Sequence, residues 1–399
     1  MKTVKELMKT YEEKLVEIRR DLHRNPELSF KEFRTTKLIK EMLREMDIEV
    51  VELGNETGVV GLLKGKEEGP TIGLRGDIDA LPITEENDIP FKSENEGIMH
   101  ACGHDVHTTS LLGAAMFLSE IRDDIKGQIK FIFQPAEEIN EGAQLLIDYG
   151  VMENPKIDAV FGLHNHPDIP AGQVGVKVGG LMAAVDTIRI KVKGVGGHGA
   201  IPNKTIDPVL TSAAIIQGIQ SIVSRNVNPL DSAVVSIGTL KAGEANNVIP
   251  EEVFMTGTVR TFNPELRKEM PNYLTRSIDH IAKAYGAEAE LEYINHLPAV
   301  INDETMAELG RKAVTEICGP EGPVDPTPSM GGEDFALYMQ DIPGCFFWLG
   351  VGNKEKGFVH QWHHPKFNAD EKALPIGAGI LAQSALEGLA YFNQKKKEE

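Results

Sequence analysis

The chain has 399 residues, of which 41% are hydrophobic and 25% charged, so it is long enough for two globular domains and is not of disordered composition. Its formal net charge of −19 argues against a nucleic-acid partner, because phosphate binding requires a clustered basic face. We expect neither a signal peptide nor a membrane span, since the N-terminal segment mixes charged with apolar residues. Three sparse cysteines (Cys102, Cys318, Cys345) are typical of reduced thiols, which predicts a cytoplasmic protein.

The first half of the chain alternates helical and β-type patterns. Residues 4–22 repeat apolar side chains at helical spacing, which predicts a helix that ends before Asn25, and a second helix is predicted over 31–46. Strands that alternate with helices indicate an α/β core with a mixed, mostly parallel sheet flanked by helices. The predicted strands cover 71–77, 127–134 and 157–164, and a helix over 108–121 separates the first two.

The pattern changes near residue 183, where strands alternate apolar and polar residues as in a sheet with one solvent-facing side. Helices predicted over 205–224 and 264–285 fall among these strands, and the order β-α-β-β-α-β is typical of a small two-layer α+β domain. After residue 298 the sequence predicts a helix, an apolar strand at 345–352 and a last helix from about residue 375. We therefore expect one α/β domain, formed by 1–182 and 298–399, with an α+β domain inserted at 183–297.

Polar residues with catalytic potential gather in a few short segments. These are DIDALP at 77–82, MHACGHDVH at 99–107, QPAEE at 134–138, GLHNHP at 162–167 and WHHP at 362–365. Most follow a predicted strand, and ligand sites of open α/β sheets lie at the carboxyl ends of strands. Of the 12 histidines, nine fall in segments with Gly or Pro, where we predict loops.

Each segment taken alone leaves more than one interpretation open. Glu137 and Glu138 are most simply a helix start, where carboxylates complement the macrodipole, although one can bind a cation while the other acts as a general base. Cys102 and His104 suit a borderline-soft divalent cation. MHACGHDVH by itself is a metal site, a redox thiol or an ordinary loop, and the redox interpretation lacks a C-x-x-C motif.

In combination, the segments resemble the aminoacylase and carboxypeptidase family of two-metal metallopeptidases. Within that family the sequence is most similar to the amidohydrolase branch, which includes N-acyl-amino-acid amidohydrolases, hippurate hydrolases and auxin-conjugate hydrolases. The resemblance runs in order over nearly the whole chain, through RRDLHRNPELSF, GLRGDIDALPI, MHACGHDVH, FIFQPAEE, GLHNHPDIPAG, GGHGAIPNKTIDPV, NVIPEE, GTVRTF, GGEDFA and HHPKFNADE. It implies that 1–182 and 298–399 form a catalytic domain and that 183–297 form a dimerisation or lid domain.

The resemblance implies a centre for two divalent ions, Mn²⁺, Zn²⁺, Co²⁺ or Ni²⁺. It makes Glu137 the general base that acts with a metal-bound hydroxide, and Asp79 a residue that orients a ligand. It favours His164 over His166 and His363 over His364. The implied metal ligands are Cys102, His104, Glu138, His164 and His363. It gives no role to His166 and His364, and it leaves His100, Asp105 and His107 as candidates for orienting the ligands or for a structural role.

The inserted domain is expected to contribute substrate contacts. The resemblance assigns His198 to the oxyanion or the substrate carboxylate, often reached from the neighbouring subunit of a dimer. Asn247 and Arg260 are candidates for binding the α-carboxylate, because arginine suits bidentate carboxylate recognition. Gly332 and Glu333, next to Gly331, resemble a loop beside the acyl group.

The implied function is a metal-dependent amidohydrolase that cleaves the amide bond of an N-acyl or N-aroyl amino acid to a carboxylic acid and a free amino acid. A carboxypeptidase, a dipeptidase or an N-acetyldiaminopimelate deacetylase of the same family is the alternative. The expected partners are a small N-acyl amino acid or short peptide and further copies of the chain in a homodimer or higher homo-oligomer. We expect no nucleic-acid or membrane partner.

Overall fold

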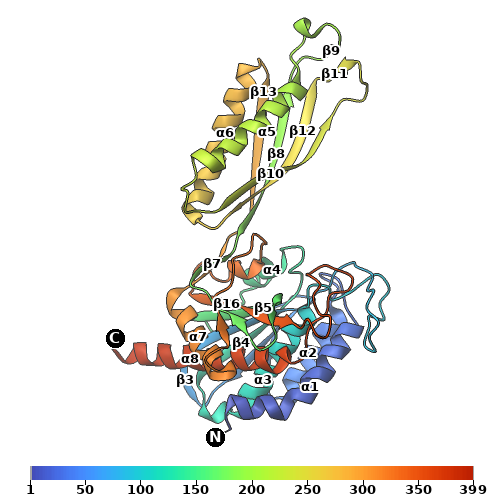
Figure 1. The fold of residues 1–399 in the computed structure, drawn as a ribbon. Helices are drawn as coiled ribbons and strands as arrows, with labels where there is room; N and C mark the ends of the chain where they lie inside the picture. Colours follow the sequence, from blue (N-terminus) through green and yellow to red (C-terminus); the bar gives the residue numbers. More distant parts are fainter. Residues whose placement is uncertain (1, 399) are drawn as a thin grey trace. The chain divides into compact units, whose positions relative to one another are not determined.

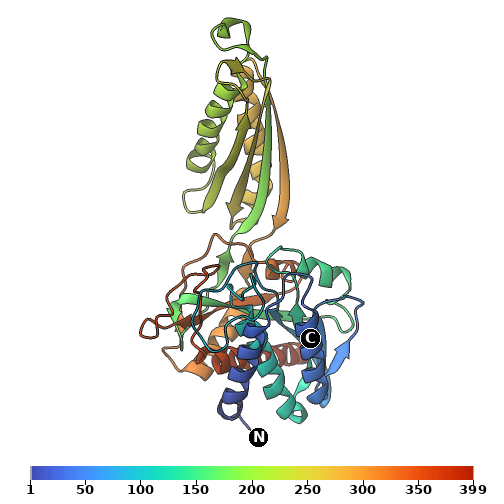
Figure 2. The same cartoon turned by 90° about the vertical axis from the view of Figure 1, so that its right-hand side faces the viewer.

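The computed structural model describes residues 2–398, which form two compact units. Unit 1 contains the described residues up to Gly179, then Ile301–Thr327 and the described residues from Asp334 onward. Unit 2 contains Gly180–Val300 and Pro328–Glu333. Figures 1 and 2 show that each unit has its own sheet and its own helices, and each also has its own core of buried hydrophobic residues.

Unit 1 is built on a mixed, mostly parallel sheet. Its strands are β1 (Glu49–Val51), β2 (Val59–Lys64), β3 (Glu67–Asp77), β4 (Lys126–Gln134), β5 (Ala159–Pro170), β6 (Val174–Gly175), β15 (Pro323–Val324) and β16 (Gly344–Gly352). Their order across the sheet is β1-β2-β4-β3-β5-β16-β6-β15. The central strands β4, β3, β5 and β16 pair in parallel, whereas β1 and β2 form an antiparallel edge. The predicted α/β fold is therefore confirmed.

Helices flank this sheet. They are α1 (Val4–Arg24), α2 (Phe33–Glu45), α3 (His104–Glu120), α4 (Gly142–Asp148), α7 (Glu304–Cys318) and α8 (Ala373–Glu398), with the 3₁₀ turns η1 (Arg122–Asp124) and η3 (Asp334–Leu337). By length and composition α8 is apolar enough to cross a membrane, but 72% of its most apolar window is buried inside the protein. It packs against α1, α3, α7 and β3, so α8 is a core helix.

Two local predictions about the histidine segments were wrong. Helix α3 begins at His104, earlier than the predicted 108–121, because Gly103 ends the preceding loop in the left-handed conformation (φ 83°) and the first turn of the helix is buried. The strand predicted over 157–164 continues to Pro170 as β5, so His166 lies within a strand and not in a loop. In both places polar side chains are buried with partners from other segments, and hydrophobic periodicity does not register such pairing.

Unit 2 is a two-layer α+β structure. It contains β8 (Ala184–Lys193), α5 (Pro208–Arg225), β10 (Ala233–Ala242), β12 (Glu252–Thr261), α6 (Pro264–Ala284) and β13 (Glu288–Leu297), with the shorter segments β9 (Gly197–His198), η2 (Pro202–Lys204) and β11 (Val248–Ile249). The short strands β7 (Gly179–Met182) and β14 (Val300–Asn302) each include a boundary in the sequence at which the chain changes unit. The main sheet is antiparallel in the order β10-β12-β8-β13, and Figure 2 shows both helices on one of its faces. The chain order is the predicted β-α-β-β-α-β.

The two helices of unit 2 begin in the same way. Asp207 caps α5 and Asn263 caps α6, each by accepting hydrogen bonds from backbone N–H groups of the first turn, and each is followed by a proline. A proline at the first helical position already has the helical φ and lacks the N–H that would be unpaired there. The assignment of catalysis to one domain and of dimerisation or lid movement to the other stays a prediction.

Candidate metal centre

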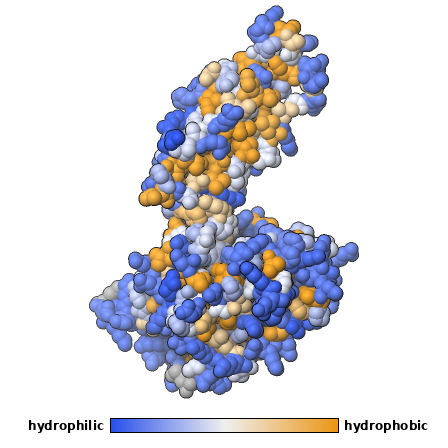
Figure 3. Space-filling view, in the orientation of Figure 1, coloured by the Kyte–Doolittle hydropathy of each residue, from blue (hydrophilic) through white to orange (hydrophobic). Residues whose placement is uncertain are grey.

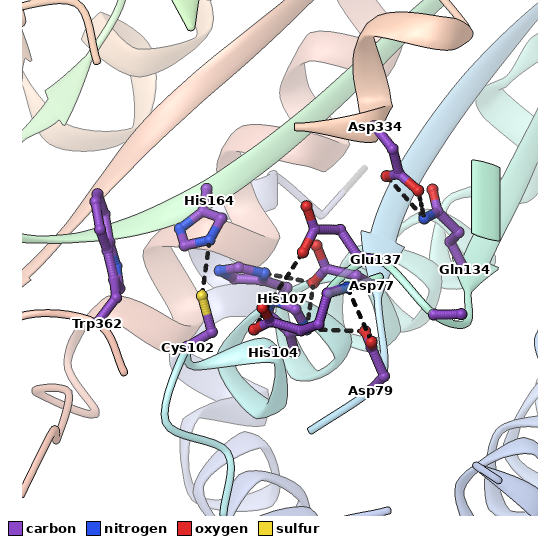
Figure 4. A network of polar contacts seen from close by, with 12 residues as sticks. Asp77, Asp79, Cys102, His104, His107, Gln134, Glu137, His164, Asp334 and Trp362 are labelled. Atoms are coloured by element: carbon purple, nitrogen blue, oxygen red, sulfur yellow. Dashed lines mark hydrogen bonds and ion pairs between the residues drawn. The ribbon is translucent and has the colours of Figure 1, made fainter. Parts of the chain in front are cut away.

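The candidate site of unit 1 lies at the carboxyl ends of its central strands. Strand β3 ends at Asp77, strand β4 ends at Gln134, and the segment with Glu137 and Glu138 follows β4 directly. Strand β5 contributes His164, and the loop before α3 contributes Cys102. Figure 4 shows side chains from these elements pointing toward one another, as the strand-end prediction requires.

The potential ligand atoms lie close together. Cys102 Sγ is 3.4 Å from His164 Nε2, His104 Nε2 is 3.8 Å from Glu138 Oε1, and His363 Nε2 is 3.5 Å from Glu138 Oε2. Three overlapping groups have all their ligand atoms within 4.8 Å of one another: Cys102 with His104 and His164, Cys102 with Glu138 and His363, and His104 with Glu137 and Glu138. The structure thus brings all five predicted ligands and Glu137 into one cluster.

Asp79 orients two members of the cluster. Its Oδ1 accepts a hydrogen bond from His104 Nδ1 at 3.1 Å, and its Oδ2 accepts one from the Glu138 backbone N–H at 3.1 Å and one from Ser29 Oγ at 2.7 Å. Because a carboxylate only accepts, His104 keeps a proton on Nδ1, and Nε2 is the nitrogen that can offer a lone pair to a cation once the ring is neutral. That Nε2 is buried without a hydrogen-bond partner among the described residues, and so is Glu138 Oε1.

The backbone that carries Glu137 and Glu138 is held on both sides. Ala136 has a positive φ of 53°, which is uncommon for a residue other than glycine, and its N–H donates to Glu32 Oε1 at 2.9 Å. The Asn140 N–H donates to the Glu137 carbonyl at 2.7 Å. This sharp turn after β4 presents two adjacent carboxylates to the cluster.

The choice between neighbouring histidines follows from their surroundings. The His166 ring packs edge-on against the stacked pair Trp348 and Trp362, and its Nδ1 accepts a hydrogen bond from the Asp168 N–H. His364 stacks on another surface histidine with ring centroids 4.2 Å apart. His363 instead adopts a positive φ of 63° that brings its ring to Glu138, and backbone strain of this kind accompanies functional sites. The geometry favours His164 and His363 as ligands.

The electrostatics of the cluster favour a cation. Burial raises the pKa of Glu138 to about 7, with a further contribution from the negative charge of Asp79. Burial and the nearby Glu138 raise the pKa of the Cys102 thiol well above its usual value. Burial acts to lower the pKa of His104, but the charge of Asp77 and the hydrogen bond to Asp79 outweigh it and raise that pKa. Bound divalent cations would compensate the carboxylates and allow Cys102 to ionise.

These residues fit a pair of divalent cations. The set offers one thiolate, three imidazoles and two carboxylates, which suits Zn²⁺, Mn²⁺, Co²⁺ or Ni²⁺. His104 Nε2 and Glu138 Oε1, two buried atoms without a hydrogen-bond partner in the described part of the chain, have the ligand chemistry that such cations need. Asp79 supplies the outer hydrogen bond that usually fixes a metal-binding imidazole.

Several buried residues behind the cluster were not singled out from the sequence. Arg75 donates to Asp77 Oδ2 at 2.7 Å, to Asp334 Oδ1 at 2.7 Å and to Gln134 Oε1 at 2.9 Å. The sequence does contain a signal for Arg75, because a charged residue inside an otherwise apolar strand is expected to be buried and therefore to need a partner of opposite charge. No comparable signal marks Asn165, since a single asparagine in a histidine-rich segment is unremarkable.

Two further residues of the MHACGHDVH segment, Asp105 and His100, are buried in the protein interior. Asp105 accepts hydrogen bonds from Arg19 Nε and from His23 Nδ1, both at 2.8 Å, and so connects α3 to α1. Burial acts to raise the pKa of Asp105, but the positive charges of Arg19 and His23 and the hydrogen bond from His23 together outweigh it and lower that pKa. His100 is buried, which lowers its pKa to about 4, and no role in the cluster follows for it.

The other predicted site residues lie in unit 2. His198 on β9 and Asn247 beside β11 are exposed on the same small antiparallel pair, where Val248 is the register partner of His198. Arg260 on β12 is half-buried, and its Nη1 has no hydrogen-bond partner in the described part of the chain. Gly332 approaches Val185 so closely that a Cβ at this position would lie 2.3 Å from Val185 Cγ2, and Glu333 follows it in the buried segment.

Comparison with known proteins places the chain among hydrolases of amide and peptide bonds. It belongs to peptidase family M20/M25/M40, whose model matches residues 73–387. The family resemblance of the sequence is therefore confirmed, and with it the prediction of an enzyme.

The relatives include both deacetylases and carboxypeptidases. The chain is 46% identical over 379 residues to N-acetylcysteine deacetylase of Bacillus subtilis (strain 168), covering 95% of this chain and 97% of that protein. It is 40% identical over 384 residues to thermostable carboxypeptidase 2 of Saccharolobus solfataricus, covering 95% and 96%. The crystal structure of Bacillus subtilis YXEP protein, described as a dinuclear metal binding peptidase from the M20 family, has 43% identity and a TM-score of 0.85 over 96% and 99% of the two chains.

Proposed function

We propose that the protein is a two-metal amidohydrolase that cleaves N-acyl amino acids to a carboxylic acid and a free amino acid. One observation carries the proposal: among the described residues, His104 Nε2 and Glu138 Oε1 are buried without a hydrogen-bond partner and lie 3.8 Å apart, beside the thiol of Cys102 and the carboxylate of Glu137. Buried polar atoms without partners are costly, so their convergence indicates a bound cation. The similarity to an N-acetylcysteine deacetylase supports the substrate class.

In this proposal, Cys102, His104, Glu138, His164 and His363 hold the cations. When bound, two divalent cations supply Lewis-acid polarisation of the substrate carbonyl and lower the pKa of the attacking water. Glu137 takes a proton from that water at its carboxylate as the oxygen bonds to the acyl carbon. The same carboxyl group then returns the proton to the amide nitrogen as the C–N bond breaks, so the amino acid leaves as a neutral amine. Asp79 keeps the His104 proton on Nδ1 during both steps.

The substrate contacts in unit 2 are part of the same proposal. Arg260, whose Nη1 has no hydrogen-bond partner among the described residues, binds the α-carboxylate together with Asn247. His198 stabilises the oxyanion from a neighbouring subunit, and Gly332 and Glu333 border the acyl group. Substitution of Arg260 by lysine tests the carboxylate contact: we expect KM for an N-acyl amino acid to rise while metal content stays the same.

Glu137→Gln tests the mechanism. The amide keeps the size of the side chain but cannot accept the proton, so we expect kcat to fall by about 10²- to 10⁴-fold while the protein still binds two metal ions. Glu141→Gln is the matched control, because Glu141 is an exposed carboxylate a few residues along the same segment. Metal content by elemental analysis and hydrolysis rates are measured for each variant. Unchanged turnover in Glu137→Gln would remove Glu137 from the mechanism.

A carboxypeptidase is the second candidate, favoured by the 40% identity to thermostable carboxypeptidase 2. Both activities use the same bond chemistry and differ in the acyl side of the substrate. A panel of N-acetyl amino acids, including N-acetyl-L-cysteine, is compared with N-benzoyl amino acids and dipeptides, with Mn²⁺, Zn²⁺, Co²⁺ and Ni²⁺ added in turn. Preference for a free-amino dipeptide over every N-acyl substrate would favour the carboxypeptidase.

We further propose a cytoplasmic homodimer formed through unit 2. The three cysteines, Cys102, Cys318 and Cys345, are free thiols, which suits a reducing compartment. Helix α5 exposes Val209 and Leu210 at 39% and 56%, and Figure 3 shows hydrophobic residues gathered on unit 2. Sedimentation of the wild type and of Leu210→Asp tests this, because the charge should shift a dimer toward monomer.

A further inference from the structure

His107, the last residue of MHACGHDVH, is buried next to the metal ligands but its nitrogens are already engaged. Its Nδ1 lies 2.5 Å from Asp77 Oδ1, and its Nε2 lies 2.9 Å from the backbone N of Asn165. A carboxylate only accepts and a backbone N–H only donates, so the proton of His107 is on Nδ1 and its Nε2 is the acceptor. Although His107 forms a possible ligand group with Asp77 and His104, it has no lone pair left for a cation.

The hydrogen bond between His107 and Asn165 lies just beyond the point where strand β5 stops pairing with strand β3. Strand β3 pairs with β5 from Ile72 with Ala159 to Arg75 with Gly162, and in the described residues the pairing ends there. Beyond this point the N–H of Asn165 donates to the His107 ring and not to a strand. Next to the metal centre, the His107 ring therefore accepts the β5 backbone hydrogen bond that a residue of β3 would accept if the pairing continued.

Asn165, held by His107, in turn forms hydrogen bonds with two proposed ligands, His164 and Cys102. Its carbonyl oxygen accepts a hydrogen bond from His164 Nδ1 at 2.8 Å, which leaves the lone pair of His164 on Nε2, directed at Cys102 Sγ 3.4 Å away. Its side-chain Nδ2 donates to the Cys102 carbonyl at 2.5 Å. Gly103 permits this approach, because a Cβ there would lie 2.5 Å from Asn165 Nδ2.

We propose that His107 is a positioning residue of the metal centre: anchored by Asp77, it fixes Asn165, which sets the tautomer of His164 and the position of Cys102. The buried Arg75 extends the chain of contacts by donating to Asp77 on its other oxygen. The inference rests on the proposed metal centre for its consequence, although the hydrogen bonds themselves do not depend on a cation.

Nitrogen-15 correlation spectra of the wild type labelled at histidine test the tautomers directly. Before metal is added, we expect His107 and His164 both to be neutral with the proton on Nδ1. After Zn²⁺ is added, we expect Nε2 of His164 to show the shift of a metal-bound nitrogen and Nε2 of His107 to keep the shift of a hydrogen-bond acceptor. A proton on Nε2 of either ring, or a metal shift at His107, overturns the proposal. A wild type that binds no Zn²⁺ refutes the proposed metal centre instead, and the tautomers still decide the relay.

Substitutions test the consequence for binding, with Co²⁺ as the probe because its thiolate absorption reports on Cys102. His107→Leu removes the acceptor for Asn165, and we expect Co²⁺ affinity to fall by about 10- to 100-fold. His107→Gln retains a side-chain oxygen and should lose less. Thr109→Val is the control, since Thr109 is equally buried on α3 and its hydroxyl has no partner among the described residues. If His107→Leu binds Co²⁺ as tightly as the control, the positioning role is refuted; if it does not fold, the tautomer spectra decide.

Discussion

Asp79→Asn should weaken metal binding, because it replaces one carboxylate oxygen of Asp79 by an NH₂ group. Asp79 accepts from His104 Nδ1 on Oδ1 and from the Glu138 N–H and Ser29 Oγ on Oδ2, whereas an asparagine has one oxygen and one NH₂ group. If the oxygen faces His104, the NH₂ group meets the Glu138 N–H, donor against donor. If it faces Glu138, the NH₂ group requires a lone pair on His104 Nδ1 and so moves the proton to Nε2, the ligand atom.

Either orientation leaves a buried donor unpaired or misplaces a proton. An unsatisfied buried donor costs about 1–3 kcal/mol, which corresponds to about a 5- to 150-fold change in an equilibrium constant. We therefore expect Asp79→Asn to bind Co²⁺ about 10- to 100-fold more weakly, and to remain slow at saturating metal. Competition with a coloured chelator measures the affinity, and Ser29→Ala is the control, because it removes one donor and leaves both acceptors. Affinity within about threefold of wild type for Asp79→Asn would refute this reasoning.

Three further results are expected. Burial raises the pKa of Glu32 from 4.5 to about 7, so its ionisation costs the folded state about 3 kcal/mol as pH rises through this window. In urea unfolding of the metal-free protein, wild type should therefore lose stability relative to Glu32→Gln between pH 5 and pH 8. The same dependence of unfolding free energy on pH in both proteins would contradict this. Chelation should speed hydrogen exchange in α3 and around Glu138 but not in α5, since every proposed ligand lies in unit 1; equal changes in both units would count against the site. Asp186→Asn should destabilise unit 2 by about 3 kcal/mol in urea unfolding, because Asp186 is a buried acceptor for Arg267, Tyr293 and the His296 N–H. An unchanged unfolding midpoint would show that the charge of Asp186 is not needed for the stability of unit 2.

The sequence predicted those elements whose pattern is hydrophobic. The strands that end at Asp77 and Gln134 and the helices of unit 2 follow from apolar periodicity, whereas the caps Asp207 and Asn263, which set where α5 and α6 begin, are seen only in the structure. The prediction that the strand ends at His164 was wrong because β5 continues to Pro170, beyond its pairing with β3, and is supported there by a side chain from α3. Strand length set by tertiary contacts is not encoded in local residue type.

The ligand set was predicted from the family resemblance, and the structure brings its members together. The residues that orient the set were mostly not predictable. Asp79 was anticipated, whereas Glu32, Asp77 and Asn165 act through backbone groups or through another side chain. Their residue types are ordinary, so only the fold identifies their partners.

The order of the proposed ligands along the chain has a consequence for biosynthesis. Cys102, His104, Glu138 and His164 precede unit 2, whereas His363 and helix α8 follow it. A ribosome therefore completes the whole of unit 2 before the last ligand and the last core helix leave the exit tunnel. Nascent chains shorter than this can hold a cation with only part of the ligand set, so full metal loading becomes a late event that coincides with closure of the unit 1 core.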